Sequence, residues 1–149
     1  MTPARFVASV AGAGLLKPAP GTVGSAVALL PGLALLMLSP WALAAGVIVA
    51  SLAGLWAIRA AGAGDDPGWV VIDELAGQWL ALLALPGPSW LGALLAFLLF
   101  RAFDIIKPGP IGRAEHLPGA WGVMADDLLG GLAAAVLLAI LRWVAPGIL

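Results

Sequence analysis

Five apolar runs, separated by short segments rich in proline and glycine, make up most of this chain and leave few folds open to it. Charged residues are 10% of the sequence, against about 25% in an ordinary soluble domain. They are too few to cover a globule of 149 residues with a water-facing surface, so lipid must solvate much of it. An apolar run of about 20 residues crosses a bilayer as a helix. The sequence therefore predicts one domain, residues 1–149, folded as an all-α, polytopic membrane helix bundle of about four to five apolar helices.

Proline and glycine mark the expected ends of these helices. The runs cover Thr22–Leu38, Trp41–Ala61, Trp69–Leu85, Trp90–Ile106 and Ala125–Val144, with a polar stretch at Gly109–Met124. Residues 5–16 are expected to form a short N-terminal interfacial helix. A signal peptide is the weaker interpretation, because the polar segment that follows directly would occupy the cleavage site. The first run contains Pro31-Gly32, so a kinked or re-entrant helix remains an alternative to a full span there.

The positive charges favour one orientation in the membrane. If the N-terminus is cytoplasmic and each run crosses once, six of the seven cations lie inside and one, Arg142, lies outside; the six are Arg5, Lys17, Arg59, Arg101, Lys107 and Arg113. This is the bias that orients membrane proteins. The same path brings every polar motif to the cytoplasmic face. The sequence therefore predicts a multi-pass membrane protein with a single site facing the cytoplasm.

Five carboxylates stand at the ends of these apolar runs: Asp73, Glu74, Asp104, Asp126 and Asp127. Acids in or beside a bilayer are costly and are by default candidates for a functional site. Acids that converge supply the oxygen ligands that a hard divalent cation needs. All five are therefore candidate metal ligands, and Mg²⁺ is the expected ion.

Four of these acids form two adjacent pairs, Asp73-Glu74 and Asp126-Asp127. Adjacent helical side chains point about 100° apart, so we expect one member of each pair to face the ion and the other to support it or bind a second ion. The alternative is that each pair only complements the positive end of its helix. Two further acids, Asp65 and Asp66, lie in a glycine- and proline-rich loop and are expected to be solvated.

Two other motifs are candidates for binding phosphate. Arg101, Asp104 and Lys107 follow one another at intervals of three residues, along one side of a helix. Two cations flanking an acid suit a phosphate beside a metal, although a helix end with snorkelling cations is the alternative. The second motif offers glycines, hydroxyls and the N–H groups of a helix N-terminus; its candidate residues are Gly21, Thr22, Gly24 and Ser25. A simple capping turn explains it equally well.

Composition excludes several functions. The net charge of −1 argues against nucleic acid as a partner. The absence of cysteine excludes thiolate catalysis and thiolate zinc sites. Two alternatives to an enzyme with a metal and phosphate site remain. One is a small cation transporter or channel subunit with acids along its ion path; the other is a different lipid-headgroup phosphotransferase.

The ordered set of motifs resembles a known family. GTVGS at 21–25, IDE at 72–74, RAFDIIKPGPI at 101–111 and GVMADD at 122–127 are similar to the phosphatidylglycerophosphatase A family, from about Gly14 to the last run. The resemblance implies an all-helical, Mg²⁺-dependent membrane enzyme that removes the terminal phosphate of phosphatidylglycerophosphate. It implies catalytic roles for Asp73, Glu74, Asp104, Asp127 and Lys107. Whether a metal-activated water or an aspartate attacks the phosphorus stays open.

Overall fold

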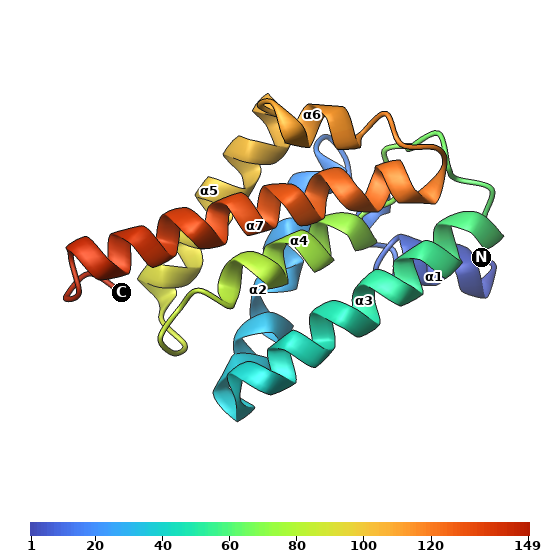
Figure 1. The fold of residues 1–149 in the computed structure, drawn as a ribbon. Coiled ribbons are helices and arrows are strands. Elements are labelled where there is room, and N and C mark those ends of the chain that lie inside the picture. Colours follow the sequence, from blue (N-terminus) through green and yellow to red (C-terminus); the bar gives the residue numbers. More distant parts are fainter.

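The computed structural model describes residues 1–149, which form helices joined by loops, with no β-strand (Figure 1). The seven α-helices and one 3₁₀ helix are α1 (Pro3–Ala8), η1 (Ala13–Leu15), α2 (Pro20–Leu38), α3 (Pro40–Ala60), α4 (Ile72–Leu82), α5 (Trp90–Ile106), α6 (Pro110–Ala114) and α7 (Ala120–Val144). The predicted all-α class is confirmed. The helix expected over residues 5–16 is replaced by two short pieces, α1 and η1.

Three helices are long and apolar enough to cross a membrane. They are α2, α3 and α7, with 19, 21 and 25 residues and mean hydropathies of 1.9, 2.0 and 1.9. Helix α5 has 17 residues, at the lower end of the length that spans a bilayer. Helix α4 has only 11 residues, or about 16 Å at the usual rise, against a hydrocarbon core of about 30 Å. The expected count of four to five apolar helices is therefore not confirmed.

Local sequence explains the helix ends that were predicted well. Ser39 caps α3 by accepting a hydrogen bond from the Ala42 N–H at 3.0 Å, and Pro40 occupies the first turn. Ser89 caps α5 in the same way, from the Gly92 N–H at 3.1 Å. Both are standard start signals. Pro31 does not end α2, which continues through it to Leu38.

Helix α4 lies at the centre of the bundle and contacts α2, α3, α5 and α7 (Figure 1). It approaches α7 most closely where two glycines face each other. A Cβ on Gly131 would collide with the carbonyl oxygen of Gly77, and one on Gly77 would lie 2.6 Å from a ring carbon of Phe100. Small residues permit this approach of two backbones in membrane helices. The contact fixes the first turn of α4 relative to α7.

Large apolar side chains cover the outside of the bundle. Val49, Leu52, Leu98 and Val136 are each more than half exposed, on three different helices. Trp41, Trp90 and Trp143 are the most exposed tryptophans and lie near helix ends, where an interfacial aromatic belt places them. This surface suits lipid rather than water.

We expect Gly131→Ala to lower the free energy of unfolding by about 1–3 kcal/mol, because the added methyl group forces α7 away from the Gly77 carbonyl. Thermal unfolding of the purified protein in detergent measures it. Gly87→Ala is the control, since a Cβ there meets no atom within 4 Å. Equal unfolding temperatures for the two variants would show that the α4–α7 contact is not close-packed.

Candidate active site

Three carboxylates converge between α4 and α7. Asp73, Glu74 and Asp127 each offer one oxygen, and these oxygens all lie within 4.8 Å of one another. Asp73 is 5% exposed and Asp127 4% exposed, while Glu74 is partly buried. Like charges this close repel strongly where little water screens them. A divalent cation would neutralise them, and we call these three residues the carboxylate cluster.

The donor set of the carboxylate cluster fits Mg²⁺. It consists of carboxylate oxygens alone, and the chain has no cysteine and a single, exposed histidine. Hard cations take oxygen ligands, and Mg²⁺ keeps several waters, so three protein ligands are enough. Both members of the first acidic pair lie in the cluster, whereas we expected one.

The start of α4 explains how adjacent acids can converge. Val71, which precedes the helix, is not helical (φ −146°, ψ 11°), and its N–H donates to the Ala8 carbonyl at 2.9 Å, so α1 holds the start of α4. Asp73 and Glu74 occupy the first helical turn, and Asp73 Oδ1 accepts a hydrogen bond from the Glu74 N–H at 3.0 Å. Side chains in a first turn are less confined by preceding helix than those in the middle. The positive end of α4 also favours their charge.

The second acidic pair does not start a helix. Helix α7 begins at Ala120, so Asp126 and Asp127 lie inside the helix, in its second turn. The helix-dipole explanation of this pair is therefore weakened, because the effect falls off within the first turn. Asp127 belongs to the carboxylate cluster, and Asp104 of α5 lies beside Asp127 but outside the cluster.

Arg101 provides the positive charge next to the carboxylate cluster. Its Nη1 lies 2.5 Å from Asp104 Oδ2 and 3.5 Å from the Ser25 hydroxyl. A Cβ on Gly21 would collide with Glu74 Oε1 and lie 3.3 Å from Arg101 Nη1. The start of α2 therefore passes close to both Glu74 and Arg101, and a side chain at position 21 would require the Glu74 carboxylate to move.

The remaining residues of the phosphate motif lie differently. Ser25 is fully buried, and its hydroxyl donates to the Gly21 carbonyl at 2.8 Å. Gly24 packs against Val71, which an added Cβ would meet at 2.6 Å. Thr22 is exposed. The structure thus brings Gly21, Ser25 and Arg101 to the carboxylate cluster, and gives Gly24 a packing contact instead.

Lys107 and Asp126 form a separate ion-paired group. Lys107 ends α5 in a left-handed conformation (φ 47°), and its Nζ lies 2.6 Å from Asp126 Oδ2 and 2.9 Å from Glu115 Oε1. Burial alone would lower the pKa of Lys107, but the hydrogen bonds to Asp126 and Glu115 outweigh it and raise this pKa. The hydrogen bond from Lys107 lowers the pKa of Glu115. Both Lys107 and Asp126 therefore lie outside the carboxylate cluster.

The sequence analysis missed one residue near these groups, Gln78, whereas it placed Asp66 correctly. Asp66 is exposed, as expected of a loop charge. It lines a cavity of about 190 Å³ with Asp65, Glu115 and Asp126. Gln78 is fully buried in α4, and neither atom of its amide has a hydrogen-bond partner. A lone polar residue one turn after Glu74 within an apolar run was the available signal.

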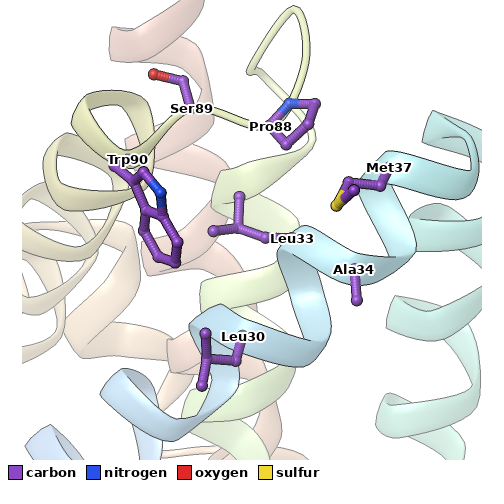
Figure 2. A pocket seen from close by; sticks show the side chains of 7 residues that line it. All are labelled: Leu30, Leu33, Ala34, Met37, Pro88, Ser89 and Trp90. Atoms are coloured by element: carbon purple, nitrogen blue, oxygen red, sulfur yellow. The ribbon is translucent and has the colours of Figure 1, made fainter.

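The opposite end of the bundle has no comparable chemistry. Figure 2 shows an apolar pocket of about 290 Å³ there, with walls formed by α2 and the segment that leads into α5. Its lining residues are Leu30, Leu33, Ala34, Met37, Pro88, Ser89 and Trp90, none of which is charged. Acids confined to one end do not mark a path through the membrane, which disfavours the transporter alternative.

Known proteins resemble the chain along nearly its whole length. Residues 6–142 match the family Phosphatidylglycerophosphatase A. The chain belongs to the phosphatidylglycerophosphatase A family. This confirms the resemblance drawn from the four motifs. No significant match was found among solved structures.

Three bacterial relatives carry two different names. A Bacteroides thetaiotaomicron protein named "Putative phosphatidylinositol-3-phosphatase" is 41% identical over 89% of this chain and 89% of its own length. Proteins named "Phosphatidylglycerophosphatase A" are 37% identical in Haemophilus influenzae, over 96% of this chain and 91% of that protein, and 33% identical in Escherichia coli, over 85% and 76%. Membership of a family of phosphatases, together with the apolar helices, makes this a membrane enzyme of phospholipid metabolism.

We expect Lys107→Met to lower the free energy of unfolding by about 3 kcal/mol, because it leaves the buried Asp126 carboxylate without its partner. Adding Asp126→Leu should recover most of the loss, since the unpaired charge is then gone as well. Thermal unfolding in detergent, without metal, measures both. Arg142→Met is the control, as Arg142 is exposed and makes no ion pair. A Lys107→Met protein as stable as this control would contradict the account.

Proposed function

We propose that the protein removes the terminal phosphate of phosphatidylglycerophosphate, giving phosphatidylglycerol and inorganic phosphate. One observation carries the proposal: three carboxylates that fit a divalent cation lie beside Arg101 at one end of an apolar bundle. Two relatives named for this activity support it.

The groups around the carboxylate cluster suit a phosphate monoester. Arg101 can neutralise charge on the transferred phosphoryl oxygens, and Asp104 holds its guanidinium in place at 2.5 Å. The N-terminus of α2 begins at Pro20, beside Arg101, and adds N–H groups that favour an anion. Mg²⁺ held by Asp73, Glu74 and Asp127 would polarise the phosphate and make water a better nucleophile.

The reaction breaks the bond between phosphorus and the glycerol oxygen of the headgroup. Water adds its oxygen to phosphorus, and its proton passes to the leaving glycerol oxygen. Direct attack by water is the simpler route. The alternative is attack by one of the aspartates, followed by hydrolysis of an aspartyl phosphate. Mass spectrometry of protein trapped with a phosphate mimic distinguishes them.

The location of the site suits a lipid headgroup. The carboxylate cluster lies near the ends of the apolar helices, so a headgroup can reach it while the acyl chains stay in lipid. In the charge count from the sequence, six of the seven cations fall on the side of the membrane that holds the polar motifs. This bias supports a cytoplasmic location of the site at the bacterial inner membrane.

Another phosphorylated lipid is the second candidate substrate. The 41% identity to the Bacteroides relative favours a phosphoinositide monoester such as phosphatidylinositol 3-phosphate. The carboxylate cluster and Arg101 would bind the phosphate of either lipid, and no residue described above recognises glycerol or inositol. A phosphotransferase would use the same groups with an alcohol in place of water.

We expect the purified protein to release phosphate from phosphatidylglycerophosphate in detergent micelles with Mg²⁺ and to lose this activity in EDTA. Asp127→Asn should lower the rate at least about 100-fold, because even residues that support metal ligands cost about 10–100-fold. Asp104→Asn should lower it less, by loosening Arg101. Asp65→Asn is the control, since Asp65 is exposed and outside the carboxylate cluster. Full activity of Asp127→Asn and Asp104→Asn would refute the proposal, and parallel assays with phosphatidylinositol 3-phosphate would establish the preferred headgroup.

A further inference from the structure

The amide of Gln78 is an anomaly in the core of the bundle. Its side chain is fully buried in α4, and neither Oε1 nor Nε2 has a hydrogen-bond partner in the protein. Most buried polar groups in native proteins are hydrogen-bonded, and each exception needs an explanation. Trp79, the next residue, follows the rule: its Nε1 donates to the Ala28 carbonyl at 2.8 Å.

Two more unpartnered groups lie in the same part of the structure. Glu74 Oε2 and Arg101 Nε are buried and have no hydrogen-bond partner. Gln78 follows Glu74 by four residues, which places both side chains on one face of α4. Glu74 and Arg101 both lie close to Gly21, where an added Cβ would collide with Glu74 Oε1 and lie 3.3 Å from Arg101 Nη1. The three groups together offer two donors, Gln78 Nε2 and Arg101 Nε, and two acceptors, Gln78 Oε1 and Glu74 Oε2, to a small oxygen ligand beside Glu74.

We propose that Gln78 is a positioning residue of this site: its amide hydrogen-bonds an oxygen ligand that also contacts Glu74, and so holds the Glu74 carboxylate in place. The ligand oxygen belongs either to the hydration water of the metal or to the phosphate of the substrate. An amide suits either, because its NH₂ group donates and its carbonyl accepts. The inference rests on the proposed function for the identity of this ligand.

A role in packing alone predicts a different behaviour of the same variant. Gln78→Met keeps the length and nearly the volume of the side chain but removes both polar atoms. Replacing a buried, unpartnered amide with an apolar group of similar shape is neutral or stabilising. If the amide had partners in the protein, the same change would instead destabilise the fold.

The test uses the purified full chain in detergent and two probes. Metal-free Gln78→Met should unfold at the temperature of the wild type or above it. If the ligand oxygen is metal hydration, the affinity for Mn²⁺ alone should fall about 10–100-fold, as measured by electron paramagnetic resonance. If it is a phosphate oxygen, Mn²⁺ affinity stays the same and the affinity for inorganic phosphate in the presence of Mn²⁺ falls about tenfold or more. Leu82→Met, one turn further along α4 and fully buried, is the matched control and should change neither affinity.

Two results would overturn the proposal. One is a Gln78→Met protein that unfolds well below the wild type without metal, which would mean that the amide is satisfied inside the fold. The other is unchanged affinity for both Mn²⁺ and phosphate. Neither result bears on the proposed function, which depends separately on whether the wild type releases phosphate from the lipid.

Discussion

The backbone contact between α4 and α7 holds the rest of this structure together. Gly77 and Gly131 let the two helices approach until any Cβ would collide. Asp73 and Glu74 stand one turn before Gly77, and Asp127 stands one turn before Gly131. The same contact therefore sets the separation of the three carboxylates. These two glycines decide whether acids from distant parts of the sequence can share a cation.

The same contact brings three negative charges together, and their mutual repulsion is unfavourable. Three carboxylates within 4.8 Å are mutually repulsive, and in a bundle surrounded by lipid little water reduces that repulsion. Arg101 offsets part of it but is already paired with Asp104. A divalent cation and a phosphate together would satisfy both the acids and the arginine, which is the charge pattern of a phosphatase site. Lys107 balances a separate group, Asp126 and Glu115, and so holds the end of α5 against α7.

Several helix ends could be predicted from the residues that mark them. Helix α5 has its expected bounds, Trp90–Ile106, because Ser89 caps its start and Pro108 follows its end. Helix α4 is three residues shorter at each end than its apolar run, Trp69–Leu85, and no proline or glycine marks its end at Leu82. Hydrophobicity does not separate a spanning helix from a short helix buried among others. Helix α7 starts five residues before the expected Ala125, within the stretch assigned to a polar loop.

The sequence predicted which residues gather at the site better than it predicted which of them contact one another. The acids gather at one end of the bundle because the chain reverses direction after each apolar run. Which acids share a ligand depends on how each helix is rotated, and helices that are apolar on all sides carry little information about rotation. The separation of Asp126 from the carboxylate cluster, and the burial of Gln78 near it, therefore required the structure.

A crystal structure with Mn²⁺ in place of Mg²⁺ tests the central claim most directly, because the anomalous scattering of Mn²⁺ locates it. The account predicts a peak between α4 and α7, with carboxylate oxygens of Asp73, Glu74 and Asp127 at coordination distance, about 2.0–2.2 Å. A peak only beside Asp65, Asp66 and Glu115, or none near the carboxylate cluster, would contradict it.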